Sequence, residues 1–541
     1  MTLSVPAFYT ILALTYVGFQ VGLWGIFVKA GLKGWQSVIP IYRSWLWLRK
    51  VIDRPWWWII LLFVPFLNIF MGYLMIWKTI RQFGKRSYLW LLPGTFFNYL
   101  FLPYFGFSKR ERFIPRAELP KFEKSTLREW GDAIVFAVAA AFLFRSFWFE
   151  LYAIPTSSME SSLMVGDYLA VSKFHFGGRI PQTVFAIPFM HHTIAGTTST
   201  PSFVDWLELP YLRLPATSSV QHNSPIVFNY PDGDTVAIER QNESYYAIVR
   251  EYEAILNPNA SKADLMMIER RYRPEEVAMI RAKYGNQPYH PGLGREAVAK
   301  DYTIKVRPVD KRENYVKRCI GLPGDKLEVI NGQVYINGQA VKNPENMQMS
   351  YLVSSPLSKK FYRKLRLNEE DMNPNAGMNE GIFCFNLKQK AQIEKAGHKV
   401  TCLIEEPGYD PAIFPHDPRY KWNKDHFGAI TIPKKGATVA LNDSTIVLYD
   451  KIIRNYEGNQ LEIRDGKIYI NGKVATQYTF KQNYYFMMGD NRHNSADSRY
   501  WGFVPEDHIV GKPVLVWLSL DKFRSWGDGK VRWNRMFRII N

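Results

Sequence analysis

Long apolar runs occupy the first 150 residues of the chain. Four runs almost free of charged side chains cover residues 7–28, 55–77, 87–108 and 133–149. Runs of this length predict helices that cross the hydrocarbon core of a bilayer. The first charged side chain is Lys29, after the first run, whereas a cleaved secretory signal carries its basic residues before the apolar stretch. The pattern therefore predicts a retained N-terminal membrane helix.

Two of these runs are not expected to form ordinary membrane-spanning helices. Pro93, Gly94 and Pro103 lie inside the third run and predict either a kinked span or a re-entrant segment. The fourth run is close to the minimum length for a span, and Arg145 near its end would have to extend toward the headgroups.

After residue 150 the pattern changes to short β-branched runs separated by turn signals. Two stretches resemble each other, Leu327–Gln339 and Leu461–Lys473. Each contains a two-residue turn signal, Asn331-Gly332 in the first and Asp465-Gly466 in the second, which predicts a β-hairpin. Two similar hairpins indicate shared local architecture rather than a repeat array.

Two stretches interrupt this strand-rich pattern. Residues 240–300 are charged and look helical over Glu243–Ile255 and Ser261–Tyr284, and residues 350–420 carry Pro, Asn and charge with little periodicity. We expect both to be insertions. The sequence thus predicts N-terminal transmembrane helices followed by a mainly β domain with inserted α/β or irregular segments. The expected parts are a multi-helix membrane region with basic loops over 1–130, a transmembrane helix over 131–150 and a β-rich domain over 151–541.

The net charge of +19 is concentrated in the first part of the chain. Residues 1–130 hold 17 Lys and Arg against 5 Asp and Glu, a balance of +12. Basic residues beside apolar runs are typical of membrane proteins, so we expect no nucleic-acid partner.

The basic loops do not fit a simple topology. Segment 109–128 is the best candidate for a cytoplasmic loop, and its seven basic residues are Lys109, Arg110, Arg112, Arg116, Lys121, Lys124 and Arg128. The fourth helix would then lead outward. Loops 29–54 and 78–86 are also basic, and strict alternation cannot place both inside. Either one run does not span, or the charge rule fails once.

Cysteine and histidine give little sign of a metal or a disulfide framework. The three cysteines are Cys319, Cys384 and Cys402. Cys384 and Cys402 either pair outside the cytoplasm or remain free thiols. The adjacent His191 and His192 have no evident third ligand. We expect no metal and no cofactor.

Three segments combine tight turns with reactive side chains. They are Ile154–Leu163 followed by Gly166-Asp167, Asn314–Asp325, and Met488–Gly502. Each alone fits an ordinary structural role: a serine-rich cap, a solvated strand edge, or a turn tied by local hydrogen bonds. Their occurrence together, in this order and directly after an apolar helix, favours a catalytic site.

These segments resemble the conserved boxes of the type I signal peptidase family, the membrane-bound Ser/Lys leader peptidases. The matching boxes are Thr156-Ser157-Ser158-Met159, Tyr315–Asp325 and Gly489–Gly502, and Ile226–Pro231 resembles the family's strand that ends in Tyr-Pro. Three positions depart from the family pattern. Ser161 replaces a usual Pro, Ser224-Pro225 replaces Gly-Asp, and His493 replaces a frequent acidic residue.

The resemblance implies a signal-peptidase-like β-fold with Ser158 as nucleophile and Lys317 as general base. It also implies that the Ser158 N–H and the Thr156 hydroxyl hold the oxyanion and that Ser495 orients the lysine. Asp497 and Arg499 would form a supporting ion pair, and Arg318 would be structural. The chemistry requires a neutral lysine, whose ordinary pKa is about 10.4, and burial lowers that pKa.

The family also implies a function and a location. We expect a serine endopeptidase that removes signal peptides, with small residues at the cleavage site, from exported preproteins. The enzyme would be a multi-pass protein of the bacterial inner membrane with its catalytic domain on the extracytoplasmic side. Its partners would be the lipid bilayer, preproteins and the export machinery. Only eight residues separate Glu150 from Ser158, at most about 28 Å of chain.

Three other classes of protein fit the sequence less well. A soluble self-cleaving repressor with a Ser/Lys pair would lack the membrane helices of residues 1–149. A Ser-His-Asp hydrolase would place Gly-x-Ser-x-Gly around Ser158, which the chain does not have. An inactive membrane scaffold would not need both Ser158 and Lys317. The sequence leaves open whether residues 1–130 tether, dimerise or recruit the export machinery.

Overall fold

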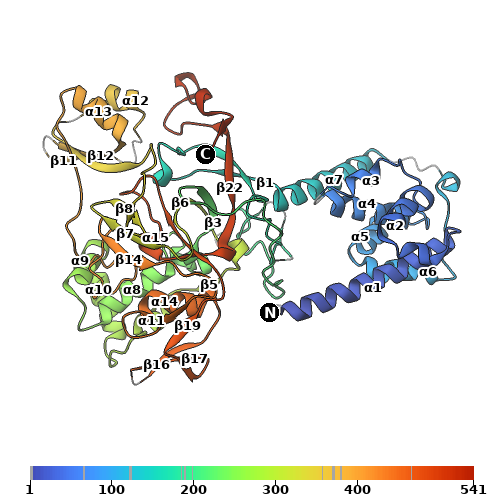
Figure 1. Cartoon of the computed structure of the whole chain (residues 1–541), viewed down its shortest axis with the longest axis horizontal. Helices are drawn as coiled ribbons and strands as arrows, with labels where there is room; N and C mark the ends of the chain where they lie inside the picture. Colours follow the sequence, from blue (N-terminus) through green and yellow to red (C-terminus); the bar gives the residue numbers. More distant parts are fainter. Residues whose placement is uncertain are drawn as a thin grey trace. The chain divides into compact units, whose positions relative to one another are not determined.

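The computed structural model contains two compact units (Figure 1). The first comprises residues 1–148, 180–190 and 202–212, and the second comprises 149–179, 191–201 and 213–541. The structure describes residues 4–64, 67–120, 125–183, 185–187, 190–197, 199–355, 357–367, 372–377, 380–464 and 466–540. Lys121, Lys124 and Asp465, named above in the sequence, lie outside the described residues.

The first unit is helical. Its helices are α1 (Val5–Lys29), α2 (Pro40–Leu46), α3 (Trp58–Leu61), α4 (Leu67–Arg81), α5 (Tyr88–Phe96), α6 (Asn98–Phe107) and α7 (Thr126–Phe147). Among the described residues, α1 and α7 are the two helices long and apolar enough to cross a membrane. Helix α7 begins earlier than the apolar run at 133 because Ser125 caps it, accepting a hydrogen bond from the Arg128 N–H at 3.4 Å.

The third apolar run folds into a helical hairpin. It breaks at Phe97, between α5 and α6. The Trp90 ring of α5 stacks on Tyr104 of α6 with 6.5 Å between ring centroids, and it also contacts Phe101. Helix α5 has nine residues, about 14 Å of helix, far short of the roughly 30 Å of a hydrocarbon core. The run therefore folds back on itself instead of forming one continuous helix.

Glycine allows α1 and α6 to pack closely. A Cβ atom on Gly22 would lie 2.5 Å from Leu102 Cβ, and one on Gly25 would lie 2.9 Å from the backbone of Gly106. Such contacts are possible only without side chains, as at helix interfaces in membranes. At the end of α1, Lys29 Nζ donates to the carbonyl oxygens of Phe105 at 2.8 Å and Ser108 at 2.7 Å, where a cation stabilises the C-terminal end of α6.

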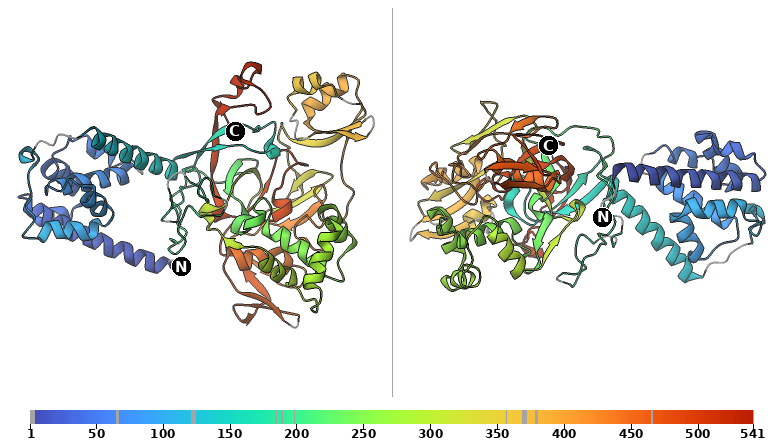
Figure 2. Two further views of the ribbon diagram at one scale, coloured as in Figure 1. Left: turned by 180° about the vertical axis from the view of Figure 1, so that it is seen from behind. Right: turned by 90° about the horizontal axis from the view of Figure 1, so that it is seen from below.

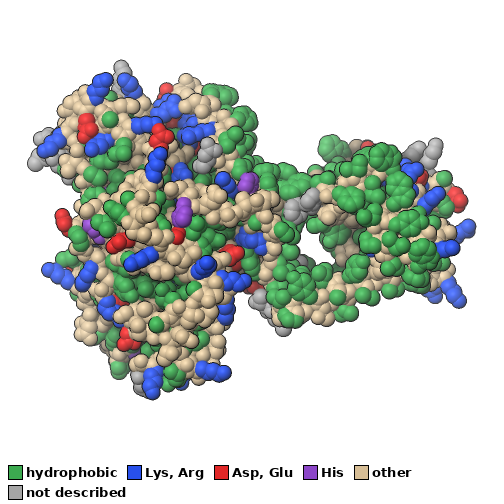
Figure 3. Space-filling model, in the orientation of Figure 1, with side chains coloured by type: hydrophobic (Ala, Val, Ile, Leu, Met, Phe, Trp, Pro, Cys, Tyr) green, Lys and Arg blue, Asp and Glu red, His purple; other side chains and the backbone are tan. Residues whose placement is uncertain are grey.

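The basic loops gather at one end of this unit. The Ile114 N–H donates to the Gln82 carbonyl at 2.7 Å, and Lys85 pairs with Glu111 at 2.9 Å. Arg116 reaches back to the Asp53 carbonyl at 2.6 Å. Basic side chains lie at one end of the unit, and hydrophobic side chains cover most of the rest of the visible face (Figure 3). The α5–α6 hairpin leads the chain from the loop at 78–86 back to the loop at 109–128 at this same end.

The second unit is mainly antiparallel β-structure, which confirms the predicted fold class. Its main sheet has the strand order β1-β2-β22-β3-β6-β20-β21, with β23 pairing β22. These strands are β1 (Phe149–Ala153), β2 (Asp167–Ser172), β3 (Pro225–Asn229), β6 (Asn314–Gly321), β20 (Tyr484–Met488), β21 (Val504–Pro505), β22 (Ile509–Ser519) and β23 (Arg538–Ile539). Strand β6 lies between β3 and β20, so the second and third boxes are neighbours in the sheet.

The hairpin predicted at Asn331-Gly332 has the expected geometry. Both residues have positive φ, 51° and 75°, as a two-residue turn between antiparallel strands requires. The smaller sheets contain β4 (Thr235–Ala237), β5 (Ile304–Val306), β7 (Lys326–Ile330), β8 (Gln333–Ile336), β9 (Gln339–Ala340), β14 (Phe427–Thr431), β15 (Thr438–Ala440), β16 (Leu461–Arg464), β17 (Lys467–Ile470), β18 (Lys473–Val474) and β19 (Gln477–Thr479). The unit also contains α14 (Ile446–Lys451) and α15 (Ser498–Trp501).

Both stretches expected to be insertions have cores of their own. The first holds α8 (Tyr245–Leu256), α9 (Lys262–Arg271), α10 (Pro274–Tyr284) and α11 (Leu293–Asp301). The second holds β10 (Gln348–Val353), β11 (Met372–Gly377), β12 (Glu380–Asn386) and β13 (Val400–Cys402) with α12 (Lys359–Leu365) and α13 (Leu387–Lys395). Both lie at the periphery of the unit in each view (Figure 2).

The three cysteines are free. In the register of the sheet, Cys384 on β12 lies opposite Ser350 and Cys402 on β13 lies opposite Tyr351. Strands β12 and β13 flank β10 on its two sides. Strands two places apart are separated by about 9–10 Å, beyond the reach of a disulfide. Of the two possibilities left open by the sequence, the structure has free thiols.

Candidate active site

The first box forms a closed loop between β1 and β2. The Ile154 N–H donates to the Asp167 carbonyl at 2.8 Å, and the Gly166 N–H donates back to the Ile154 carbonyl at 2.9 Å. Inside this loop, Ser157–Met159 form one turn of 3₁₀ helix. The fully buried Met159 anchors the turn in a hydrophobic cluster, which fixes the position of Ser158 beside it.

The second box brings a buried lysine to this serine. Lys317 lies on β6 with 4% of its surface exposed. Its Nζ is 2.6 Å from Ser158 Oγ and 3.1 Å from the Val316 carbonyl oxygen. Burial lowers the pKa of Lys317 to about 8, although the carboxylates of Asp497 and Asp490 oppose that shift. A neutral amine in hydrogen-bond contact with a hydroxyl can take its proton.

The third box holds the backbone of the nucleophile turn. The Asn491 N–H donates to the Ser158 carbonyl at 3.1 Å, and its side-chain amide donates to the Ser157 carbonyl at 3.3 Å. Asn494 donates to the Ser157 hydroxyl at 3.2 Å. The sequence prediction did not assign roles to Asn491 and Asn494, although both lie inside the matched box.

Gly489 lets this box approach the turn. A Cβ atom there would lie 2.2 Å from Ser495 Oγ and 2.5 Å from the Ser158 carbonyl oxygen, distances that no side chain permits. The approach of the two segments therefore depends on glycine at this position.

A buried ion pair supports the same loop. Asp497 accepts from Arg499 Nε at 2.9 Å and Nη2 at 2.8 Å, and also from the Gly489 N–H at 3.1 Å. Arg499 is 1% exposed and donates further to the carbonyls of Arg492 and Lys424. The structure thus brings together the two residues proposed as an ion pair.

Ser495 and Thr156 are the two other residues expected to support the reaction. Ser495 is buried, and its hydroxyl donates to the Ala496 carbonyl at 3.5 Å, while within the described residues the Lys317 amine bonds to Ser158 and Val316. Thr156 lies at the start of the 3₁₀ turn with an exposed side chain. Their roles in orienting the lysine and binding the oxyanion stay predictions.

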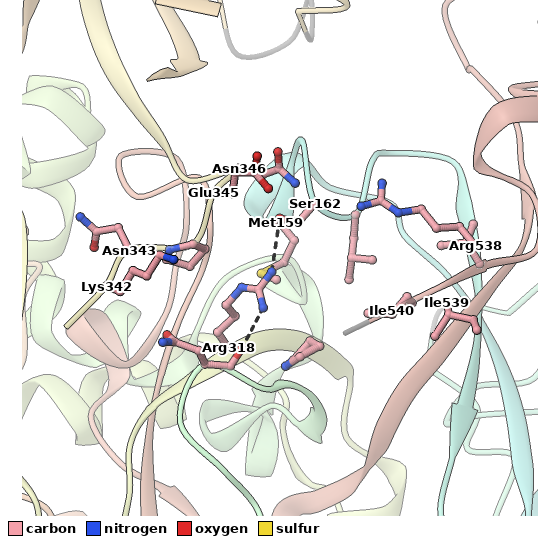
Figure 4. Close-up of a pocket in the computed structure, with 15 residues that line it drawn as sticks. Met159, Ser162, Arg318, Lys342, Asn343, Glu345, Asn346, Arg538, Ile539 and Ile540 are labelled. Atoms are coloured by element: carbon pink, nitrogen blue, oxygen red, sulfur yellow. Dashed lines mark hydrogen bonds between the residues drawn. The ribbon is translucent and has the colours of Figure 1, made fainter. Parts of the chain in front are cut away.

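Arg318 points to the opposite face of β6 from Lys317. Its Nε donates to Asp490 at 2.8 Å, and Nη1 donates to the Asn223 carbonyl at 2.8 Å. It projects into a cavity of about 500 Å³ that Met159, Ser162 and Asn346 also line (Figure 4). The lining residues include the chain neighbours of the reactive pair, Met159 and Arg318, but neither Ser158 nor Lys317.

The departures from the family pattern also have definite positions. Ser161 has φ of 67°, which the ring of proline cannot adopt. The His493 side chain is 2% exposed, with Nε2 2.8 Å from Asp425 and Nδ1 accepting from the Ser350 N–H at 3.2 Å. His191 and His192 bond to the Arg312 carbonyl and to Glu313, and the described residues contain no group of three potential metal ligands around them.

A serine hydroxyl against a buried lysine, in a β-rich unit that follows an apolar helix, defines the class of membrane-anchored Ser/Lys peptidases. The model of the family "Signal peptidase, peptidase S26" matches residues 127–379 and 474–518, more than half of the chain. The chain belongs to this family. Residues 35–116 match a second model, a family of unknown function (DUF5684).

Several curated relatives are named signal peptidase I. The protein of Buchnera aphidicola subsp. Schizaphis graminum is 29% identical over 231 residues, 42% of this chain and 55% of the relative. That of Haemophilus influenzae is 24% identical over 448 residues, 80% of this chain and 84% of the relative. That of Aquifex aeolicus is 51% identical over 45 residues, 8% of this chain and 18% of the relative. The chain thus spans little more than half the length of the Buchnera relative.

Breaking the Asp497–Arg499 pair should be strongly destabilising. In Asp497→Asn the buried guanidinium keeps its charge without compensation, which we expect to cost about 3–5 kcal/mol of unfolding free energy. The matched control is Asp417→Asn. Asp417 makes the same bidentate contact with Arg419 two residues on, at 2.8 and 2.5 Å, but that arginine is 47% exposed. The control should cost about 1 kcal/mol or less. Both variants are measured by denaturant unfolding. Equal losses of unfolding free energy in the two variants would contradict the structural importance of the buried pair.

Proposed function

We propose that this chain is a signal peptidase I, a serine endopeptidase that removes N-terminal signal peptides from exported preproteins. The single observation that carries the proposal is the 2.6 Å contact between Ser158 Oγ and the buried Lys317 amine. Family membership supports the same reaction. The substrate would be an extended peptide with small residues at the cleavage site, bound alongside the strands of the main sheet.

The proposed reaction begins with proton transfer from the Ser158 hydroxyl to the neutral Lys317 amine. The oxygen then attacks the carbonyl carbon of the scissile bond. The Ser158 N–H and the Thr156 hydroxyl would hold the resulting oxyanion, and one such donor is worth about 3–4 kcal/mol in the transition state. The lysine ammonium gives its proton to the leaving amine, and an acyl-enzyme remains. Water, activated by the same lysine, releases the signal peptide.

The chain is a membrane-anchored signal peptidase with two candidate spans, α1 and α7. We propose further that it is a multi-pass protein of the bacterial inner membrane, with the basic end of the helical unit in the cytoplasm. Helix α7 starts at this end, where Arg128 donates to the Arg86 carbonyl at 2.9 Å, and its 22 residues measure about 33 Å. The strands that follow would then lie on the extracytoplasmic side, where signal peptides emerge. The export machinery remains a proposed partner.

Ser158→Ala and Lys317→Ala should each abolish cleavage because one removes the nucleophile and the other its base. The assay is incubation of the purified full chain with a preprotein, followed by N-terminal sequencing of the mature product. Lys326→Ala, an exposed lysine on β7, is the control and should retain wild-type activity. Substantial cleavage by either site variant, with its fold intact by circular dichroism, would overturn the assignment of the dyad.

The pH dependence should report the lowered pKa of Lys317. The ammonium form cannot accept a proton, so kcat/KM should rise about tenfold per pH unit below the pKa and level off above about pH 8. An ordinary lysine would give a plateau only above about pH 10.4. The profile is measured with one preprotein from about pH 6 to about pH 10, with tryptophan fluorescence showing that the chain stays folded. A midpoint near 10 would contradict Lys317 as a buried base.

The side of the membrane on which the β-rich unit lies is testable with the chain's own cysteines. Cys402 is exposed, and Cys319 and Cys384 are buried. A membrane-impermeant thiol reagent should therefore label the native protein at Cys402 in right-side-out membrane vesicles. Cys402→Ser is the control and should remove the label. Labelling confined to inverted vesicles would place the β-rich unit in the cytoplasm and refute the proposed topology.

A further inference from the structure

The second insertion makes direct contact with the nucleophile turn. Gln348, the first residue of β10, is 1% exposed. Its side-chain Nε2 donates to the Ser161 hydroxyl at 2.9 Å. Ser161 is only three residues after Ser158. Asn386, at the end of β12 in the same insertion, donates to the same hydroxyl at 3.4 Å.

The backbone of Gln348 is joined to the third box as well. Its N–H donates to the Asp490 carbonyl at 2.8 Å, and its carbonyl accepts from the Arg492 N–H at 2.9 Å. Gln348 thus forms a parallel bridge with Asn491, whose own N–H holds the Ser158 carbonyl. One residue therefore touches both segments that fix the nucleophile, the turn through its side chain and the box through its backbone.

Ser161 is a position where the turn needs support. Its φ of 67° lies in the left-handed region, which costs a side chain other than glycine about 1 kcal/mol or more. A partly buried hydrogen bond to its hydroxyl stabilises this conformation. The turn that presents Ser158 is thus held in part by a segment almost 200 residues away in the sequence.

We infer that Gln348 is a positioning residue for the proposed peptidase reaction, acting through Ser161 to set the orientation of the Ser158 hydroxyl and N–H. This inference rests on the proposed function. It gives the second insertion a role in catalysis, since its first strand completes the support of the nucleophile. Gln348 takes no part in proton transfer, so the protonation of Lys317 does not depend on it.

The test compares Gln348→Ala with Gln392→Ala in the full-length protein. Gln392 lies on α13 of the same insertion with an exposed side chain, so its loss should change nothing. Gln348→Ala keeps the backbone bonds of β10 and, among the hydrogen bonds of the described residues, removes the one to Ser161. It should lower kcat for preprotein cleavage by about tenfold to a hundredfold, because misplacement of a reacting group costs this much. KM should stay within about twofold, and the midpoint of the pH profile should not move.

A double mutant separates positioning from general destabilisation. Ser161→Ala removes the other half of the same hydrogen bond, so Gln348→Ala combined with Ser161→Ala should fall no further than the more affected single variant. Three outcomes would each overturn the positioning role and leave the proposed function standing. They are losses of kcat that multiply in the double mutant, an unchanged kcat in Gln348→Ala, and a loss of kcat that only follows a lower melting temperature. Failure of the wild-type chain to cleave any preprotein would overturn both.

Discussion

Removal of the Lys317 amine from water is the constraint on which the rest of the site depends. An ammonium group is stable in water and useless as a base, and only a low-polarity environment makes the neutral form available near pH 8. Strand β6 provides that environment because it lies between β3 and β20 in the sheet. The carboxylates nearby oppose the shift, and one of them is neutralised by Arg499 and the other by Arg318. The two ion pairs therefore serve the lysine by limiting the negative charge that faces it.

The contact between Ser158 and Lys317 was predictable from the sequence because both residues belong to local motifs. Tyr315–Asp325 specifies most of strand β6 and the turn after it, and Gly489–Gly502 specifies the turns and the short helix α15 that follow β20. Strands β6 and β20 are neighbours in the sheet. The turn at Asn331-Gly332 was predictable for the same reason, since its positive φ angles depend on two adjacent residues. In these places the information needed lies within a few positions.

Long-range and geometric features were not predictable in this way. Nothing local marks Gln348 as a support for Ser161, because the contact exists only after two distant segments have folded together. The apolar run over 87–108 has the length of a span whether it is one helix or two short antiparallel ones, and hydropathy does not distinguish them. The left-handed conformation of Ser161 was hidden for a similar reason, since serine has no preference for it.

Gly489 shows that a site can depend on a volume that must stay empty. Because it has no side chain, the Ser158 carbonyl oxygen and the Ser495 hydroxyl can both lie close to its Cα, where a Cβ atom would collide with them. In a saturation screen for activity, all nineteen replacements at this position should be depleted as completely as those at the nucleophile, although glycine contributes no functional group. A map of mutational tolerance would therefore mark Gly489 as essential, and chemistry alone would not explain why.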